Sequence, residues 1–288
     1  MEGHGNSLDE LYLLGFPARH SVGPAMYGAV FRRLGIGAVY RVLEVPPEAL
    51  GGALEVLRRR RCRGFNVTIP HKTKIVAHLD LLEPPADTIG AVNTVVVEDG
   101  RLVGHNTDVH GFREALLRFT GLRRWGRAVL VGAGGAARAA AYALRDLVEE
   151  LVIVSRTGRT AEKLARDAEA WGVPRATGHT ASPQVYRRVL SEAGLLVNAS
   201  PVGMEPRSDE TPIPAELLRP GTVVFDMVYR PLKTRLLREA EKAGCTVIDG
   251  LWMLAGQAAE NMRLWYGFRV ETEEFREAAL KAMGCEKP

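Results

Sequence analysis

A glycine-rich turn is the first part of the chain whose residue types and spacing indicate chemistry. Residues 132–137 read GAGGAA and match the pattern G-x-G-x-x-G/A, between a strand predicted at Ala128–Val131 and a helix predicted at Ala136–Leu147. In that setting the first glycine permits a tight turn, and the second lets the backbone approach a pyrophosphate. The N–H groups and the dipole of the following helix favour the phosphate charge. The pattern predicts a dinucleotide site made by Gly132, Ala133, Gly134, Gly135 and Ala136.

The end of the next predicted strand, Leu151–Ser155, indicates which dinucleotide is bound. Many NAD-binding proteins carry an acidic residue there, which holds the ribose hydroxyls and repels a 2′-phosphate. This chain instead has Ser155, Arg156 and Thr157, with Arg159 close behind. Guanidinium and hydroxyl groups both bind phosphate, although the two arginines could also be solvated loop residues. The sequence therefore predicts NADP(H) in preference to NAD(H), and an oxidoreductase that transfers a hydride to or from a small substrate.

Three polar clusters follow predicted strands in the first part of the chain. They read GFPARHSVGP at residues 15–24, NVTIPHK at 66–72 and GHNTD at 104–108, and AVNT at 91–94 lies between the last two. Taken alone, Lys72 could be a solvated charge in the first turn of a helix, and Asp108 could be a helix N-cap. The histidines of these clusters lack the spacing of metal ligands, so no metal site is predicted.

The elements that must position these residues alternate between short apolar runs and helical periodicity, which is typical of a parallel α/β protein. Residues 111–249 are predicted to form a doubly wound, Rossmann-type NADP-binding domain. Residues 1–110 would form a second α/β domain that binds the substrate, and C-terminal helices from 250–288 would return to complete it. A ligand cleft is expected between the two domains, which is a favoured place for small-molecule sites.

The composition is that of an ordinary globular protein, with 46% hydrophobic and 25% charged residues among 288. The net charge of +4 predicts no nucleic-acid partner unless it gathers on one face, and the run Arg58–Arg61 is expected to be a solvated helix end. No apolar run reaches the length of a membrane span, and Met1–Glu10 lacks the core of a signal peptide. Cys62, Cys245 and Cys285 form no C-x-x-C pair, as is typical of a reducing compartment. A cytoplasmic protein is predicted.

The polar clusters, taken together with three later segments, resemble the shikimate dehydrogenase family. The later segments read NASPVGM at residues 198–204, DMVYRPL at 226–232 and GLWMLAGQA at 250–258, and the resemblance runs in order from about residue 11 to beyond 260. It implies the reversible, NADP-dependent reduction of 3-dehydroshikimate to shikimate in aromatic amino acid (chorismate) biosynthesis. The family's catalytic pair falls on Lys72 and Asp108. Such a pair suits the reaction, because hydride transfer to a ketone leaves an alkoxide that needs a proton.

The same resemblance implies further ligand-binding residues. Gln257 could instead be a polar interruption on a buried helix, and Tyr229 a packed aromatic residue. The partner would be the small-molecule substrate, and the protein would be a monomer or a homodimer. The implied substrate-binding residues are Ser21, Gly23, Asn66, Thr68, Asn93, Thr107, Tyr229 and Gln257, and the further cofactor-binding residues are Ser200, Val228 and Gly250.

The chain departs from the family pattern at two places that bear on specificity. The pattern H-S-x-S-P holds the substrate carboxylate with two serines, but here the second is Gly23. Loss of a hydrogen bond to a charged group costs roughly 1.5–3 kcal/mol, and a dehydrogenase for quinate, or for both quinate and shikimate, is therefore an alternative. The clamp N-R-T-x-x-R has its second arginine one position early, at Arg159, which allows dual use of NAD and NADP. A non-catalytic protein that senses a dinucleotide or metabolite is a more distant alternative.

Overall fold

The computed structural model describes residues 8–60, 62–121 and 123–285. Most of the polar N-terminal segment and Arg61 of the arginine run lie outside these residues. Contacts within the chain define two units. The first unit consists of the chain up to Thr107 together with the chain from Ala258 onward, and the second unit spans Asp108–Gln257. The sequence analysis placed the two boundaries near residues 110 and 249. Across the described part of the chain, no helix combines the length and apolar character that a membrane crossing requires.

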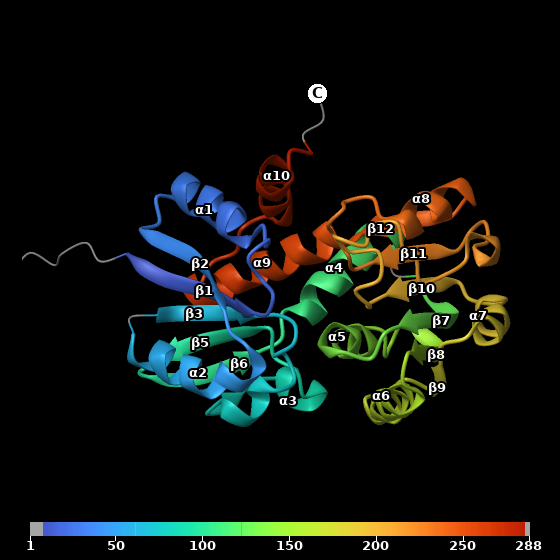
Figure 1. Cartoon of the computed structure of the whole chain (residues 1–288), viewed down its shortest axis with the longest axis horizontal. Coiled ribbons are helices and arrows are strands. Elements are labelled where there is room, and N and C mark those ends of the chain that lie inside the picture. Colours follow the sequence, from blue (N-terminus) through green and yellow to red (C-terminus); the bar gives the residue numbers. More distant parts are fainter. Residues whose placement is uncertain (1–7, 61, 122, 286–288) are drawn as a thin grey trace, which may run out of the picture. The chain divides into compact units, whose positions relative to one another are not determined.

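The first unit contains a six-stranded mixed sheet with the order β2-β1-β3-β5-β6-β4 (Figure 1). Its strands are β1 (Asp9–Gly15), β2 (Ala38–Glu44), β3 (Cys62–Val67), β4 (Leu81–Leu82), β5 (Thr94–Glu98) and β6 (Arg101–His105). β1 is parallel to β2 and β3, whereas β5 is antiparallel to β3 and β6. The carboxyl ends of β1, β3 and β6 therefore meet the amino end of β5 at one edge of the sheet.

Helices cover both faces of this sheet. They are α1 (Gly23–Leu34), α2 (Leu50–Arg59), α3 (Ala86–Ile89), the later turns of α9 (Gly250–Tyr266) and α10 (Thr272–Ala282), with 3₁₀ turns at Pro47–Ala49 and Ile75–His78. Successive residues of a strand face opposite sides, so Phe65 of β3 packs with the α2 leucines while Gly64 and Asn66 face the other side. A Cβ on Gly64 would overlap the indole of Trp265 on α9. The missing side chain therefore lets α9 lie close to β3.

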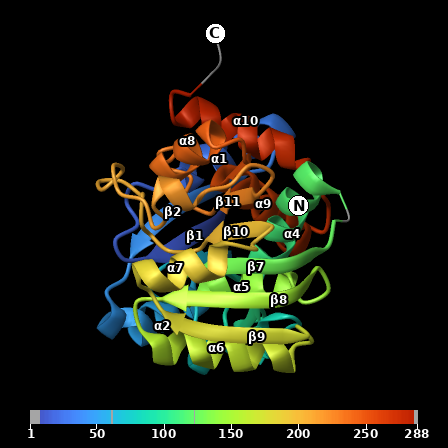
Figure 2. The same cartoon turned by 90° about the vertical axis from the view of Figure 1, so that its right-hand side faces the viewer.

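The second unit contains a six-stranded parallel sheet with the order β12-β11-β10-β7-β8-β9, of which Figure 2 shows β9, β8, β7, β10 and β11 in succession. Its strands are β7 (Trp125–Val131), β8 (Val148–Ser155), β9 (Arg175–Thr180), β10 (Leu195–Asn198), β11 (Val223–Asp226) and β12 (Thr246–Asp249). This succession is the 3-2-1-4-5-6 order of a Rossmann fold. The order reverses between β7 and β10, where such sheets bind their ligands. The predicted doubly wound fold is confirmed.

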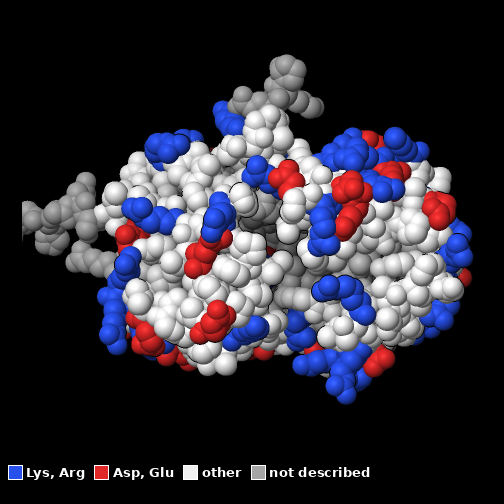
Figure 3. Space-filling view, in the orientation of Figure 1, with Lys and Arg blue, Asp and Glu red and all other residues white. Residues whose placement is uncertain are grey.

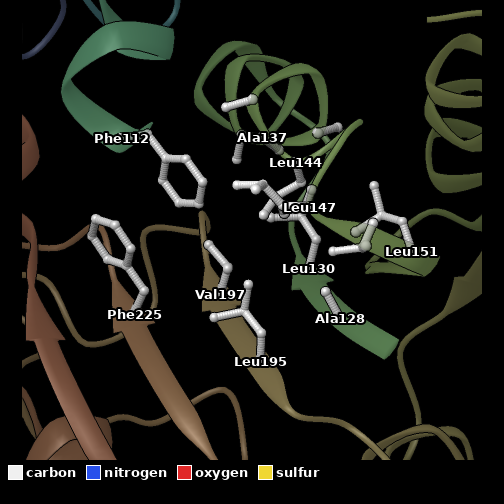
Figure 4. Packing of buried hydrophobic residues seen from close by; sticks show 14 of the residues in the cluster. Phe112, Ala128, Leu130, Ala137, Leu144, Leu147, Leu151, Leu195, Val197 and Phe225 are labelled. Carbon is white, nitrogen blue, oxygen red and sulfur yellow. The ribbon is translucent and has the colours of Figure 1, made fainter. Parts of the chain in front are cut away.

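Apolar side chains hold the helices of this unit on its sheet. The helices are α4 (Asp108–Thr120), α5 (Gly135–Ala143), α6 (Gly158–Ala170), α7 (Pro183–Leu190), α8 (Arg235–Lys242) and the first turns of α9, with a 3₁₀ turn at Ala215–Leu217. Phe112 of α4 stacks on Phe225 of β11 with ring centroids 4.8 Å apart, next to Leu130 and Val197 (Figure 4). This packing fixes the strand ends that carry the glycine turn.

The strands predicted at Ala128–Val131 and Leu151–Ser155 are confirmed within β7 and β8. Elements that were not predicted include β9, α7 and α8, because β9 is an edge strand whose RATGHT sequence buries only Ala176, and each of the two helices has only eight residues. β7 begins at Trp125, before the predicted start at Ala128. The helix expected to reach Leu147 ends at Ala143, since Leu144 and Leu147 enter the core from a turn and so extend the apolar pattern past the helix.

Charged side chains of both signs are interspersed on the face shown in Figure 3. Several form ion pairs, such as Arg127 with Glu150 at 2.5 Å. Arg58, which was expected to be a solvated helix end, instead donates to Asp80 at 2.5 Å and to the carbonyl of Gly100 at 2.8 Å. That expectation is wrong for Arg58, because its side chain ties α2 to the turn between β5 and β6.

Candidate active site

The loop after β1 carries the first of the expected substrate-binding residues and is held by Glu44. The carboxylate of Glu44 accepts hydrogen bonds from the backbone N–H groups of Ala18 and Arg19 at 3.0 and 3.2 Å, and from Nε of Arg19 at 2.9 Å. These bonds lower the pKa of Glu44 to about 2, the Arg19 side chain having the largest effect. Further along the loop, Oγ of Ser21 accepts from the N–H of Gly23 at 3.1 Å. Glu44 and Ser21 therefore hold the loop in a defined shape.

Tyr40 borders the position where the family pattern has its second serine. A Cβ on Gly23 would lie 3.0 Å from Cε1 of Tyr40 and 3.2 Å from Oγ of Ser21. The Tyr40 hydroxyl donates to Oδ1 of Asn66 at 2.8 Å, and the ring stacks on Tyr27 at 4.3 Å between centroids. A side chain at position 23 would have to displace this ring by a few tenths of an ångström. Tyr40 was not among the predicted site residues, because tyrosine is common in strands.

The segment after β3 brings Thr68 and Lys72 to the same edge. The N–H of Thr68 donates to the carbonyl of Leu14 at 2.8 Å, which ties the segment to β1. Lys72 is half-buried, and its carbonyl accepts from the N–H of Val92 at 2.8 Å. Val92 directly precedes Asn93, so the backbone of Lys72 is bound beside the start of β5.

Asn93 and Thr107 bind each other through both backbone and side chain. The N–H of Thr107 donates to Oδ1 of Asn93 at 2.7 Å, and Nδ2 of Asn93 donates to Oγ1 of Thr107 at 3.0 Å. Asp108 follows Thr107 as the first residue of α4 and is buried. Lys72, Asn93, Thr107 and Asp108 are therefore linked in a continuous series of hydrogen bonds and peptide bonds.

Asn66 has a different place from Asn93, although both were expected to line the substrate. Its Nδ2 donates to the carbonyl of Asn93 at 3.1 Å and to Oγ1 of Thr94 at 3.0 Å. Its Oδ1 accepts from the hydroxyls of Tyr40 and Tyr27 at 2.8 and 3.4 Å. A carboxamide has two N–H groups and two lone pairs, so protein groups occupy all four hydrogen-bonding positions of Asn66.

The glycine turn has the geometry that a pyrophosphate requires. Gly132 has φ of 113°, a left-handed conformation that favours glycine, and a Cβ there would lie 2.9 Å from the carbonyl of Ala199 after β10. A Cβ on Gly134 would meet nothing within 4 Å, and α5 begins directly afterwards at Gly135 without a side-chain hydrogen bond at its N-cap. The open space and the N–H groups at this helix end fit the phosphates of a dinucleotide.

The segment after β8 presents the two arginines expected at a 2′-phosphate. Arg156 and Arg159 are both exposed, on either side of the point where α6 begins at Gly158. Ser155 is buried, and its hydroxyl lies 3.0 Å from that of Thr160. Thr160 stands where the family clamp has its second arginine, and it bonds back to this loop, so Arg159 is the residue that can supply the second guanidinium.

A buried pair of polar residues joins the loops after β10 and β11. Nδ2 of Asn198 donates to Oδ1 of Asp226 at 2.9 Å, and Oδ1 of Asn198 accepts from the Ser200 hydroxyl at 2.6 Å. Asp226 also accepts from the N–H of Val228 at 3.0 Å and from the hydroxyl of Thr234 at 2.6 Å. Burial raises the pKa of Asp226 to about 6, despite the hydrogen bonds that lower it. The Asn198–Asp226 pair therefore holds Ser200 and Val228, which were both expected to bind the cofactor.

The remaining expected residues of the second unit lie near the start of α9. A Cβ on Gly250 would overlap the carbonyl of Met227, so glycine is needed where α9 begins against the loop after β11. Tyr229, two residues further along that loop, is half-buried. Gln257 is buried, and its Nε2 donates to the carbonyl of Leu254 at 3.2 Å. Among the described residues, no group of three metal-binding side chains occurs.

These features define the class of the protein. A Rossmann sheet with an open glycine turn and two arginines after its second strand binds a dinucleotide phosphate. The other α/β unit carries a half-buried lysine among amide and hydroxyl groups, and a buried aspartate is the first residue of the Rossmann unit. The protein is a nicotinamide-dependent oxidoreductase of two α/β units.

Comparison with known proteins identifies the family. Residues 13–95 match the family described as "Shikimate dehydrogenase substrate binding domain". Shikimate dehydrogenase (NADP(+)) of Thermococcus kodakarensis is 48% identical over 94% of this chain and 96% of its own. The crystal structure of shikimate 5-dehydrogenase from Thermus thermophilus with NADP(H) and shikimate has a TM-score of 0.85 and 42% identity, and covers 96% of this chain and 100% of that one. Quinate dehydrogenase from Corynebacterium glutamicum with NAD has a TM-score of 0.86 and 31% identity, and covers 95% and 99%. The chain belongs to the shikimate dehydrogenase family.

Proposed function

We propose that the protein catalyses the reversible, NADPH-dependent reduction of 3-dehydroshikimate to shikimate in the biosynthesis of aromatic amino acids through chorismate. Its relative from Thermococcus kodakarensis is an NADP-dependent shikimate dehydrogenase, and a similar crystal structure holds NADP(H) and shikimate. The observation that carries the proposal is the series of bonds that joins Lys72, Asn93, Thr107 and Asp108. It ties the two residues that proton transfer requires to one edge of a sheet.

Lys72 and Asp108 would carry the proton transfer. NADPH, when bound, supplies the hydride, and the ketone oxygen becomes an alkoxide that must receive a proton. The Lys72 ammonium group would donate that proton, and in the reverse reaction the neutral amine would accept it. The buried carboxylate of Asp108 would orient the ammonium group and accept a hydrogen bond from a substrate hydroxyl. Further hydroxyl and amide groups for the substrate would come from Ser21, Thr68, Asn93, Thr107, Tyr229 and Gln257.

Lys72→Ala tests this assignment, with Lys74→Ala as the matched control because Lys74 is an exposed lysine of the same segment. Loss of a general acid lowers kcat by roughly 10²–10⁴-fold. We expect that loss for Lys72→Ala with an unchanged melting temperature and unchanged NADP⁺ binding, and near-normal turnover for Lys74→Ala. Similar turnover in both variants would contradict the role of Lys72.

The cofactor would be NADP(H), held at the glycine turn and at the loop after β8. The pyrophosphate would face the start of α5, and Arg156 and Arg159 would bind the 2′-phosphate. Arg156→Ala should weaken NADP⁺ binding much more than NAD⁺ binding, whereas Arg166→Ala, an exposed arginine further along α6, should change neither. Calorimetric titration of both cofactors measures this difference. Equal losses of NADP⁺ and NAD⁺ affinity in Arg156→Ala would refute the phosphate contact.

The overall activity is tested by initial rates of nicotinamide reduction with shikimate and quinate, each paired with NADP⁺ and NAD⁺. We expect the highest kcat/KM with shikimate and NADP⁺. Absence of turnover in all four pairs, in folded protein that binds a cofactor, would refute the proposed reaction and favour a sensing role.

Oxidation of quinate is the second candidate function, and Gly23 is the observation that favours it. Quinate carries a hydroxyl on a saturated carbon beside the carboxylate, and Gly23 leaves room there that a serine would fill. Gly23→Ser adds both a hydroxyl and a Cβ that crowds Tyr40, whereas Gly23→Ala adds the Cβ alone. If Gly23 sets specificity, the serine variant raises the kcat/KM ratio of shikimate to quinate, and the alanine variant shows how much of that rise the Cβ alone produces. An unchanged ratio in the serine variant would contradict a role of Gly23 in specificity.

We also propose a cytoplasmic location and a monomer or homodimer. Cys62 is buried, Cys245 half-buried and Cys285 exposed, and all three are free thiols, as is typical of proteins in reducing compartments. Sedimentation velocity would distinguish the two oligomeric states.

A further inference from the structure

A buried asparagine of α9 lies at the centre of the polar residues of the first unit. Asn261 is fully buried. Its Oδ1 accepts hydrogen bonds from the hydroxyls of Thr94 and Thr107 at 2.8 and 2.9 Å, and its Nδ2 donates to the hydroxyl of Tyr27 at 2.8 Å. These partners come from β5, from the segment after β6 and from α1. One side chain of α9 therefore binds three segments of the unit.

Oδ1 of Asn261 lies closer to the hydroxyls of Thr94 and Thr107 than Oδ1 of Asn93 does. Each threonine hydroxyl has a single proton, and the bonds to Oδ1 of Asn261, at 2.8 and 2.9 Å, are shorter than those to Oδ1 of Asn93, at 3.2 and 3.3 Å. Their oxygens accept in turn from Nδ2 of Asn66 and Nδ2 of Asn93, each at 3.0 Å. Since Asn261 directs the hydroxyl protons, it also sets which way the two neighbouring amides point.

A closed ring of hydrogen bonds results. Asn66 donates to Thr94, and Thr94 donates to Asn261. Asn261 donates to Tyr27, and the Tyr27 hydroxyl donates back to Asn66 at 3.4 Å. All four side chains are buried, where an unmade hydrogen bond destabilises strongly and a complete network favours one arrangement.

We infer that Asn261 is a positioning residue for the reaction: through the Thr107 hydroxyl it fixes the carboxamide of Asn93 and the backbone that leads into Asp108. The inference rests on the proposed function, in which Asn93 and Thr107 bind the substrate and Asp108 takes part in proton transfer. Asn261 itself was absent from the residues that the sequence indicated. Without its Oδ1, the Thr107 proton turns to Oδ1 of Asn93, which lies 3.3 Å away. In that orientation the hydroxyl of Thr107 competes with the N–H of Thr107 for Oδ1 of Asn93.

Two substitutions of Asn261 separate positioning from simple stability. Asn261→Leu removes the acceptor and keeps the branching at Cγ, and Asn261→Asp keeps an acceptor for both threonines. Trp265→Phe is the matched control, because it removes another buried hydrogen bond of α9, from Nε1 to the carbonyl of Val95 at 3.1 Å, and keeps an aromatic side chain to pack on Tyr27. The measurements are kcat, KM for shikimate, KM for NADP⁺ and the melting temperature of each variant.

We expect Asn261→Leu to lower kcat/KM for shikimate by roughly tenfold to a hundredfold, with the KM for NADP⁺ unchanged. Trp265→Phe should lower the melting temperature and leave the kinetic constants near those of the wild type. Asn261→Asp should retain more of kcat/KM than Asn261→Leu. If Asn261→Leu and Trp265→Phe both lower only the melting temperature, Asn261 is a structural residue and the inference is overturned.

A double-mutant cycle gives an independent test if Asn261→Leu folds poorly. Asn261→Ser with Thr107→Val should lower kcat/KM no more than the stronger single variant, because both changes break one connection. Losses that multiply would overturn the connection through Thr107. Wild-type protein without turnover of shikimate would contradict the proposed function and the inference together, whereas normal turnover in all Asn261 variants would contradict the inference alone.

Discussion

Replacing Asp226 with asparagine should remove a measurable pH dependence of stability. The carboxyl group is 0% exposed, and burial raises its pKa from 3.8 to about 6. One pKa unit corresponds to about 1.36 kcal/mol, so a shift of about two units corresponds to roughly 3 kcal/mol. Asparagine has nearly the same shape. Its Oδ1 can accept from Asn198 and Val228, and its Nδ2 can donate to the oxygen of Thr234.

The sign of this pH dependence follows from whether the folded or the unfolded state holds the proton of Asp226. Between the unfolded pKa of 3.8 and the folded pKa of about 6, the folded protein keeps a proton on Asp226 that the unfolded chain has released. Raising the pH through this window therefore lowers the free energy of unfolding, by up to roughly 3 kcal/mol. Below the window both states are protonated, and above it both are ionised, so the dependence ends on either side. Asparagine does not titrate, so the Asp226→Asn variant does not lose this free energy of unfolding as the pH rises.

The assay is urea unfolding of the wild type and of Asp226→Asn at a series of pH values across the window. The free energy of unfolding of the variant should rise relative to that of the wild type by roughly 3 kcal/mol between the acidic and neutral ends. Asp146→Asn is the control, since hydrogen bonds from Arg113 lower the pKa of Asp146 below 3.8, so the stability that Asp146 contributes is lost only as the pH falls below the window. A constant difference between Asp226→Asn and the wild type would refute the claim that this carboxyl titrates within the window.

Three further substitutions test the packing and the loop after β1. Phe112→Ala removes the ring stacked on β11 and should destabilise the second unit by about 3–5 kcal/mol in thermal or urea unfolding. Gly64→Ala should destabilise the protein by about 1–3 kcal/mol in the same assay because its Cβ overlaps the indole of Trp265, whereas Gly126→Ala, with nothing within 4 Å, should change stability little. Glu44→Gln should raise the KM for shikimate and leave the KM for NADP⁺ unchanged. An unchanged KM for shikimate would mean that this carboxylate does not position the loop.

The Rossmann unit was the more predictable of the two units because its determinants are local. Each strand of a parallel sheet is a short apolar run, and the turn between β7 and α5 follows from five consecutive small residues. The positive φ of Gly132 and its closeness to Ala199 explain why glycine stands there. The edge strand β9 was not predicted, because it buries few side chains and therefore contains no apolar run.

The polar residues of the first unit were only partly predictable, because their hydrogen bonds connect distant parts of the chain. Asn93 and Thr107 stand in motifs at the ends of strands, and their mutual bonds span only 14 residues. Asn261 binds Thr94 across 167 residues and Tyr27 across 234. An asparagine inside an otherwise ordinary helix gives no sign of such partners, and neither does a tyrosine within a strand.

Asn66 and Asn93, the two asparagines of the substrate motifs, differ in their hydrogen-bond partners in a way that the motifs alone do not indicate. Asn66 and Asn93 are both carboxamides at the same edge of one sheet, and sequence patterns assign them the same role. In the folded unit every donor and acceptor of Asn66 is satisfied by protein groups, whereas Asn93 binds the residue that precedes Asp108. A buried amide whose four positions are filled can recognise a ligand only by giving up a bond. The binding of substrate by Asn66, which the family resemblance implies, would therefore exchange one of these bonds, and the 3.4 Å bond from the Tyr27 hydroxyl is the longest of the four.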